Sequence, residues 1–359
     1  MTDPPDPASL DRAARSNVSL ALRGTLKQAS NKTAPWNHRL LGRLFSGFAT
    51  TLGALPAWLS YAFADALAAV LVLVTYATKR QTTRKRRGFY YNTRIVFRGS
   101  LSPRQRRRLL WRWARHMTHL GVDVCRMPNI TEDNFRDTCD VSELDDVYGT
   151  YDLGQGIIAA TGHIGVYEYS SHLVSLCGMS IVTIFRPSPI EPITDVLNKI
   201  RSSGGQIMAK REGGVRTMLR ALANHQIVGL VADNSAKDSE LHTPFLGTNA
   251  ATSKTAGILH LKTGAPIVLV TAQRTGRQRF RLQHWDTFSH TPTDNREADL
   301  AVISKRINDA LSRAVCAYPE QWFWDSRRFR GRPDDEVLDV DGLPPQVNPE
   351  QVDIETADL

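Results

Sequence analysis

From Val147 onward, short runs of β-forming residues alternate with longer helical stretches, and this alternation limits the fold more than any other feature. We predict strands at 156–161, 180–185, 227–232, 266–271 and 279–285, and helices at 166–177, 191–202, 213–224, 252–262 and 296–317. Such alternation is typical of an α/β domain with a largely parallel or mixed central sheet flanked by helices. Ligands gather at the carboxyl ends of the strands in such sheets, so the residues after each strand are candidates for a functional site.

A different pattern precedes this domain. Leu52 to Ala77 is almost wholly apolar and is interrupted only by Pro56 and Asp65. About 20 such residues are needed to cross the hydrocarbon core of a bilayer. The basic segment 79–87 that follows is typical of a cytoplasmic flank. We therefore predict an N-terminal hydrophobic membrane-anchor helix, with a buried helix of a soluble core as the alternative.

The charge around this anchor bears on its topology. Residues 1–48 hold seven basic and three acidic residues, and positive charge resists translocation. Asp65 would cost about 2.5–3.5 kcal/mol at the bilayer centre. Both observations favour an anchor that dips into or lies along the inner leaflet, bent at Pro56, over a single crossing.

Composition suggests five segments. They are a polar, flexible lead (1–48), the membrane anchor (49–78), a basic helical region (79–146), the α/β domain (147–332) and an acidic, flexible tail (333–359). Ser102 and Pro103 suit the cap and first position of a helix in the basic region. The tail holds nine acidic residues and no Lys or Arg, which leaves 45 basic against 27 acidic residues elsewhere. A body this basic expects an anionic partner, such as a lipid headgroup surface, nucleic acid or an acidic protein.

The residues after the first predicted strand carry the leading candidate site. His163 lies between Gly162 and Gly165, and Glu168 follows five residues later. Five residues on a regular helix separate two side chains by about 140°, so the two can meet only if His163 lies in a loop before the helix. Imidazole can then accept a hydroxyl proton at neutral pH while the carboxylate orients the ring. A structural histidine is the alternative.

The sequence contains no recognisable motif for a protein nucleophile, a metal site or a bound cofactor. No Gly-x-Ser-x-Gly elbow or Cys–His signature supplies a protein nucleophile, so direct attack by an acceptor hydroxyl is the simpler scheme. The four cysteines stand far apart, which argues against a zinc site and a disulfide framework. Without a phosphate loop or dinucleotide fingerprint, we expect neither a metal nor a bound cofactor.

His163-x4-Glu168 resembles the His-x4-Asp/Glu block of the lysophospholipid acyltransferase superfamily, and its surroundings are similar to the bacterial lipid A late acyltransferases (lauroyl and myristoyl transferases). Matching segments follow in order within about 50–333, namely 92–97, 185–187, 197–204, 215–222, 227–234, 244–252, 263–266 and 319–329. The ordered set is specific, although no single segment is. Asp325 and Ser326 replace a hydrophobe and a histidine usual in that branch, and Asn234 replaces glutamine. These departures concern the identity of the acceptor lipid.

The resemblance implies a glycerolipid acyltransferase-like domain that moves a fatty acyl chain from a thioester to a hydroxyl of a membrane lipid. The donor would be an acyl carrier protein or coenzyme A thioester, and the acceptor a lipid A precursor. The expected location is the cytoplasmic face of a bacterial inner membrane, with a monotopic or single-pass anchor. Alternatives are a glycerolipid, aminolipid or glycolipid acceptor, or a non-catalytic lipid-binding relative. Nucleic-acid binding is disfavoured because the basic residues cluster beside the apolar anchor.

Four residues are the candidates for catalysis. We expect His163 to be the general base and Glu168 its orienting partner. The resemblance implies that Arg201 binds an anionic headgroup or steadies developing oxyanion charge. It also implies that Asp233, at the end of a strand, is a catalytic or binding acid. The alternatives are a solvated arginine and a turn aspartate.

Five further residues are candidates for substrate binding. Arg186 follows a strand and is a candidate anion ligand. Arg327 and Arg328 can clamp a phosphate bidentately. Trp322 and Trp324 are expected to line an acyl slot. The alternatives are surface arginines and core aromatics.

Overall fold

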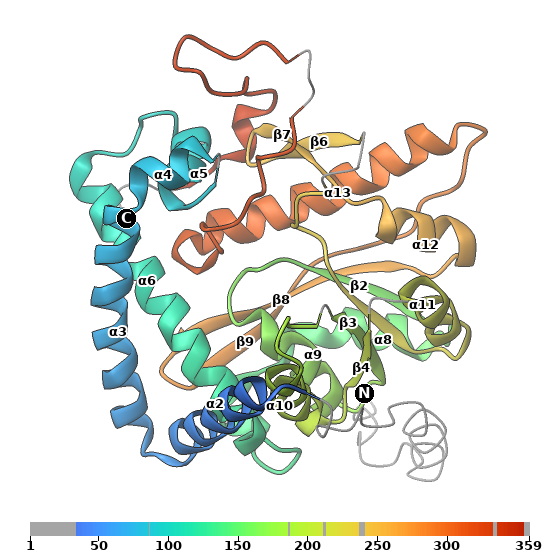
Figure 1. Cartoon of the computed structure of the whole chain (residues 1–359). Helices are drawn as coiled ribbons and strands as arrows, with labels where there is room; N and C mark the ends of the chain where they lie inside the picture. The colour runs from blue at the N-terminus through green and yellow to red at the C-terminus, as the bar shows by residue number, and fades with distance from the viewer. Residues whose placement is uncertain are drawn as a thin grey trace.

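The computed structural model describes residues 34–85, 87–185, 187–210, 213–236, 241–332 and 336–354. A seven-stranded sheet has the order β1-β9-β8-β2-β5-β3-β4, and β6 and β7 form a separate antiparallel pair (Figure 1). The strands of the large sheet are β1 (Cys139–Asp140), β2 (Ile157–Thr161), β3 (Ile181–Phe185), β4 (Ile207–Lys210), β5 (Ile227–Val231), β8 (Ile267–Gly276) and β9 (Arg279–Phe288). Neighbours pair in parallel except β8 with β9. The predicted fold class is confirmed.

Helices cover both faces of this sheet. They are α8 (Asp145–Asp152), α9 (Tyr167–Leu176), α10 (Glu191–Arg201), α11 (Gly214–Ala223), α12 (Thr255–Thr263) and α13 (Arg296–Ala317). In Figure 1, α13 lies above the sheet and α9 below it. Ile158 of β2 packs into the core cluster that contains α13, and the adjacent Ile157 packs into the cluster that contains α9. Burial on both faces explains the continuous apolar runs of the central strands.

Four short strands were not predicted. Besides β1 and β4, they are β6 (His242–Phe245) and β7 (Thr248–Ala251). Each has two to four residues, which is too short for an alternating pattern to stand out from loop sequence.

The predicted anchor is divided into two helices. α2 (Trp36–Ala54) ends before Leu55, whose ψ is 151°, and α3 (Ala57–Ala77) begins after Pro56. The residue before a proline avoids the helical region, and proline cannot donate to the preceding turn. The predicted bend at Pro56 is therefore confirmed. However, α2 lies largely within the lead predicted to be flexible, because its polar residues concealed an amphipathic pattern.

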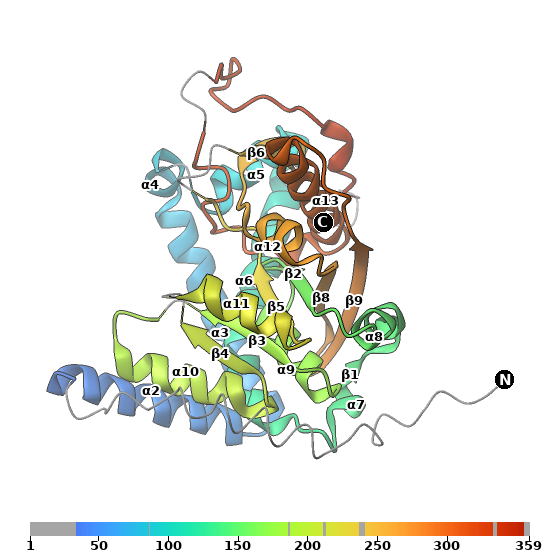
Figure 2. The same cartoon turned by 90° about the vertical axis from the view of Figure 1, so that its right-hand side faces the viewer.

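The basic region contains the helices α4 (Lys79–Arg84), α5 (Phe89–Phe97) and α6 (Pro103–Arg126), and it also includes β1. Ser102 caps α6: its hydroxyl accepts from the Gln105 amide at 3.3 Å, and its own amide donates to the Gln105 side chain at 2.9 Å. α3 runs along α6 at one side of the molecule (Figure 1), while α2 lies beside α10 (Figure 2).

α3 alone among the described helices is long and apolar enough to cross a membrane. Its inner face is nevertheless buried in the protein at Ser60, Tyr61, Ala64 and Ala68. One face of α3 is therefore packed against the domain, chiefly along α6.

Part of the tail predicted to be flexible is packed against the body. Residues 336–354 include Leu343, which is buried, and Asp339, which pairs with Arg98 at 2.7 Å. The Gln351 side chain accepts from the Gly247 amide at 3.0 Å. Scattered apolar residues and these long-range partners hold a segment that looks like a solvated acidic tail in the sequence.

Candidate active site

The site lies at the carboxyl edge of two adjacent parallel strands. Thr161 at the end of β2 is paired with Val231 at the end of β5. His163 and Asp233 each follow two residues later, so the register brings them together. The distance between His163 Nδ1 and Asp233 Oδ1 is 2.7 Å, and the His163 amide donates to Asp233 Oδ2 at 2.9 Å.

A third donor completes the environment of Asp233. The indole Nε1–H of Trp322 donates to Oδ2 at 3.0 Å. Burial raises the pKa of the Asp233 carboxyl, but the charge of His163 and the hydrogen bonds from His163 and Trp322 outweigh it and lower the net pKa. Asp233 is therefore a fixed, ionised carboxylate inside the protein.

The Asp233 carboxylate determines the tautomer of His163 and influences its pKa. Because Asp233 only accepts hydrogen bonds, Nδ1 carries the proton and Nε2 of the neutral ring has a free lone pair. Burial lowers the pKa of His163, whereas the charge and hydrogen bond of Asp233 and the charge of Glu168 raise it, and the net shift is upward. The side chain keeps 20% of its surface exposed. Within the described ranges, no residue forms a hydrogen bond with Nε2.

Several backbone groups of the loop after β2 are hydrogen-bonded to the closing segment and to β8. The His163 carbonyl accepts from the Phe323 amide, and the Gly165 amide donates to the Gln321 carbonyl, both at 2.9 Å. The Val166 amide donates to Ala272 at 2.7 Å. Gly165 has a φ of +64°, and a Cβ there would collide with the Ala272 carbonyl oxygen. The prediction that His163 lies in a loop before α9 is confirmed.

Glu168 does not have the predicted partner. Its carboxylate accepts from Arg201 Nε at 2.7 Å and Nη2 at 2.6 Å, while the described structure has no hydrogen bond between Glu168 and His163. Asp233 takes the orienting position instead, so the predicted pairing is wrong. Glu168 lies in the first turn of α9 and Arg201 in the last turn of α10, where the helix dipoles favour each charge.

The structure therefore brings together the four residues predicted for catalysis, in a different arrangement. His163 and Asp233 form one pair, and Glu168 and Arg201 form a second pair close enough for Glu168 to influence His163 electrostatically. Burial lowers the pKa of Arg201, and Glu168 more than offsets this effect. Both Nε and Nη2 of Arg201 are engaged, which leaves Nη1 for a ligand.

The predicted phosphate clamp is wrong for Arg328. This side chain is fully buried, with Nη1 donating to Ala251 at 2.8 Å and Nη2 to Asn308 at 3.0 Å. Its guanidinium also lies over the Phe245 ring, 4.8 Å from the centroid. Burial lowers the pKa of Arg328 to about 10. Arg327 is exposed, so the two arginines do not face a common ligand.

The predicted acyl slot is also corrected. Trp322 and Trp324 are fully buried, with ring centroids 4.7 Å apart. Trp324 donates to the Pro319 carbonyl at 2.6 Å. Both belong to the core, and Trp322 supports Asp233 rather than contacting substrate. Arg186 lies outside the described residues.

Gln321 and His116 were not predicted from the sequence, and Trp322 was assigned a different role, although all three hydrogen-bond to the loop or to Asp233. Gln321 and Trp322 lie in the closing segment of the family resemblance, but nothing in that segment reveals which side chain faces Asp233. His116 is 49 residues before Gly165, whose carbonyl it contacts through Nε2 at 3.0 Å. No local pattern distinguishes it from other histidines of a basic helix.

A buried carboxylate on Nδ1 and an available Nε2, placed at the carboxyl edge of a parallel sheet, give His163 the geometry that a general base requires. A sequence model of the bacterial lipid A biosynthesis acyltransferases matches residues 38–331. The chain belongs to this family.

Individual relatives are more distant. The lipid A biosynthesis palmitoleoyltransferase of Escherichia coli (strain K12) and the lipid A biosynthesis acyltransferase of Shigella flexneri are each 26% identical over 197 residues, which cover 54% of this chain and 62% of theirs. A phosphatidylinositol mannoside acyltransferase of Mycolicibacterium smegmatis is 22% identical over 205 residues, which cover 56% of this chain and 65% of its own. The chain thus spans about three fifths of the length of the curated relatives it matches.

Proposed function

We propose that this protein is a lipid O-acyltransferase that moves a fatty acyl chain from an acyl thioester to a hydroxyl of a membrane lipid. The observation that carries the proposal is the His163–Asp233 pair, whose geometry provides a base for a hydroxyl proton. The family and the names of its relatives support a lipid A precursor as the acceptor. The donor is an acyl carrier protein or coenzyme A thioester.

In this mechanism, His163 Nε2 takes the proton from the acceptor hydroxyl as its oxygen attacks the thioester carbonyl. The imidazolium is stabilised by the ionised Asp233, as in hydrolase triads. The tetrahedral intermediate collapses by breaking the carbon–sulfur bond, and the thiolate takes the proton back from Nε2. An ester and a free thiol result, and no acyl group is attached to the protein.

Arg201 is the candidate ligand for an anionic headgroup. Glu168 holds its Nε and Nη2, so the guanidinium is oriented before substrate arrives. Preorganised donors lose little conformational entropy when they bind a ligand. The side chain of Arg201 retains 20% exposure.

The outer faces of α2 and α3 form an apolar surface suited to a bilayer. Exposed side chains include Leu40, Leu44, Trp58, Val70 and Leu73, and Phe48 contacts Phe63 across the bend, with centroids 6.2 Å apart. Extended apolar patches of this kind mark interaction sites. Exposed Lys79, Arg80, Arg84 and Lys85 follow α3 and suit anionic headgroups. We place this surface on the cytoplasmic face of the inner membrane.

The packing of α3 favours a monotopic attachment. α3 runs along α6, on which Arg104, Arg107, Arg108 and Arg112 are exposed. If α3 crossed the bilayer, this charged helix would be carried into the hydrocarbon core with it, at a cost of about 2.5–3.5 kcal/mol for each arginine near the centre.

A second class of acceptor lipid is the alternative to a lipid A precursor. The similarity to a phosphatidylinositol mannoside acyltransferase favours a glycolipid acceptor other than lipid A as the runner-up. Both hypotheses use the same site geometry and differ only in the acceptor lipid, so an assay that offers both acceptors distinguishes them.

The purified full-length chain in detergent micelles provides the test. Acyl carrier protein and coenzyme A thioesters are each offered with a lipid A precursor or with a mannosylated phosphatidylinositol, and acylated lipid is measured by mass spectrometry. We expect transfer to the lipid A precursor and a loss of about 10²–10⁴-fold in His163→Ala. The control is His225→Asn, at an exposed turn residue whose φ of +58° asparagine tolerates. Transfer by His163→Ala at the wild-type rate, or none by the wild type, contradicts the proposal.

A further inference from the structure

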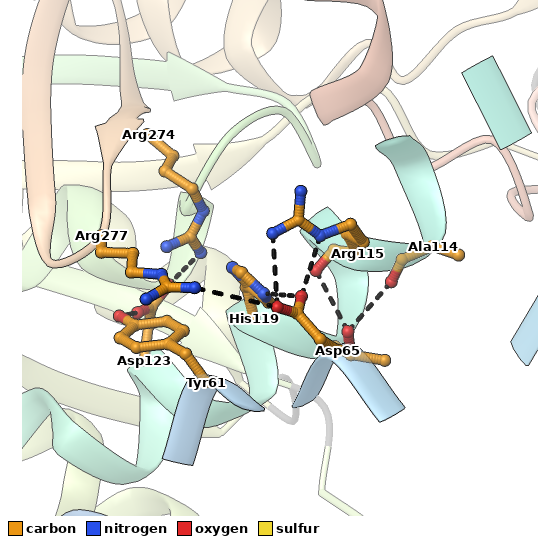
Figure 3. Close-up of polar contacts among 9 residues, drawn as sticks. Tyr61, Asp65, Ala114, Arg115, His119, Asp123, Arg274 and Arg277 are labelled. Carbon is orange, nitrogen blue, oxygen red and sulfur yellow. Dashed lines mark hydrogen bonds and ion pairs between the residues drawn. The ribbon is translucent and has the colours of Figure 1, made fainter. Parts of the chain in front are cut away.

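α3 carries polar residues on its inner face, and they form two contacts with the α/β domain and α6 (Figure 3). Asp65 accepts from His119 Nε2 at 2.7 Å and from Arg115 Nε at 2.8 Å, both on α6. Arg277, from the turn between β8 and β9, lies 4.0 Å from the same carboxylate. A helix that faced only lipid would not form polar contacts of this kind, so this face of α3 is packed against the protein.

The second contact lies one turn earlier on α3. The Tyr61 hydroxyl donates to the Asp123 carboxylate of α6, which also pairs with Arg274 of β8. Tyr61 and Asp123 are almost fully buried. The Asp123 carbonyl further accepts from the Tyr169 hydroxyl of α9 at 2.8 Å. α3 is therefore tied to the elements that surround the catalytic loop.

Two routes lead to Gly165, two residues after His163: one from the second contact through Arg274, and one from His116 of α6, the helix against which α3 packs. Arg274 exchanges two backbone hydrogen bonds with the Gln321 side chain, at 2.9 and 3.0 Å. The Gln321 carbonyl accepts from the Gly165 amide at 2.9 Å. On the opposite side, His116 of α6 approaches the Gly165 carbonyl at 3.0 Å through Nε2. The Gly165 amide is thus linked to Tyr61 of α3 through Gln321, Arg274 and Asp123, and its carbonyl is held by α6, which packs along α3.

The protonation state of His116 suits this task. Burial, aided by the charge of Arg274, lowers its pKa to about 3. The ring is therefore neutral at physiological pH, and its one N–H must be on Nε2 to bond a carbonyl oxygen. A hydrogen bond donated by a buried, neutral group does not change with pH near neutrality.

We propose that α3 and α6 position the catalytic loop, with His116 as the positioning residue that holds Gly165 and thereby His163. The apolar helix is then part of the active-site scaffold in addition to its lipid-facing role. The kinetic consequence rests on the proposed acyl transfer, whereas the loop contact does not.

Hydrogen–deuterium exchange of the full chain in detergent micelles tests the contact without any assay of activity. His116→Phe keeps a ring but removes the donor, and Tyr61→Phe removes one hydroxyl. We expect peptides covering 161–168 to exchange about tenfold faster or more in both variants, because local opening becomes easier when its closing bonds are lost. His116→Gln, which restores an N–H donor, should recover slow exchange.

Matched controls separate this effect from general loosening. His260 is also buried and contacts the Ala265 and His290 carbonyls at 2.8 and 3.0 Å. These residues lie beside the amino end of β8, at the opposite edge of the sheet from His163, because β8 runs parallel to β2. Tyr151 accepts from the Ser180 amide at 3.1 Å, also before a strand. His260→Phe and Tyr151→Phe should leave exchange of 161–168 unchanged.

Kinetics provide the second readout. A displaced base lowers kcat and spares acceptor binding, so His116→Phe should lose about tenfold or more in kcat with KM within about twofold, and His116→Gln should regain most of it. Unchanged loop exchange in both His116→Phe and Tyr61→Phe, or an equal increase in the two controls, overturns the inference. Absence of transfer by the wild type contradicts the proposed function instead, and the exchange data still decide the role of α3.

Discussion

Asp233 Oδ1 lies 2.7 Å from Nδ1 of His163, although the two residues are 70 positions apart in the chain. The contact exists because β2 and β5 are neighbours in the sheet and end in register. It assigns the orienting role to a different carboxylate from the one nearest in sequence.

Replacement of Asp233 by asparagine should remove most of the activity. Asparagine can donate to Nδ1, which would put the ring proton on Nε2 and leave no base there, so we expect kcat to fall by about 10²–10⁴-fold. The carboxylate also stabilises the imidazolium and contributes to the raised pKa of His163. The rising limb of residual kcat/KM against pH should therefore move to lower pH in the variant. A limb that moves upward, or wild-type kcat, would refute the assignment.

Glu168 and Arg201 should instead affect acceptor binding. Glu168→Gln keeps the shape but weakens the two charge-assisted hydrogen bonds that orient Arg201. We expect acceptor KM to rise roughly tenfold while kcat changes less than about threefold. If Glu168 oriented the base, kcat would fall as far as in Asp233→Asn.

A matched control is available for this pair. Asp286 receives two hydrogen bonds from Arg306, at 2.7 and 2.8 Å, in the same bidentate arrangement near the carboxyl end of β9. This position adjoins the amino end of β8, away from the site. Asp286→Asn should therefore leave both kinetic constants near wild type, since exposed pairs contribute little.

The sequence predicted much of the fold because the elements of the domain are long and regular. Local patterns located β2, α9 and the loop between them, and therefore the position of His163 at the carboxyl edge of the sheet. They did not pair it with Asp233, because the order of strands in a sheet depends on which distant strands pack together. Trp322 and Trp324 lie two residues apart with the same composition around them, yet one supports Asp233 and the other only the core.

Arg328 should be essential for stability and Arg327 dispensable. Arg328→Met would leave the Ala251 carbonyl and the Asn308 side chain without their buried donor. A buried polar group left unpaired costs about 1–3 kcal/mol, so we expect a loss of about 3 kcal/mol or more in the free energy of unfolding. Arg328→Lys should recover little, because lysine lacks the planar fork. Arg327→Met, at an exposed position, is the control. Denaturant titration measures all three, and equal midpoints for Arg328→Met and wild type would contradict the structural role.

The topology prediction concerns the two ends of the apolar helices. Residues 1–48 carry seven basic and three acidic residues, and α3 is held against α6 by Asp65 and Tyr61, so we expect both ends on the cytoplasmic side. Cysteines are introduced singly at Ser16 and at Ser100, which is exposed between α5 and α6, after the four native cysteines are replaced. Both should resist a membrane-impermeant thiol reagent in intact spheroplasts and react after lysis. Labelling of Ser16→Cys before lysis, with Ser100→Cys still protected, would establish a crossing by α3. Tyr61, Asp65 and the arginines of α6 would then have to enter the bilayer with it, at a cost that their mutual contacts would have to offset.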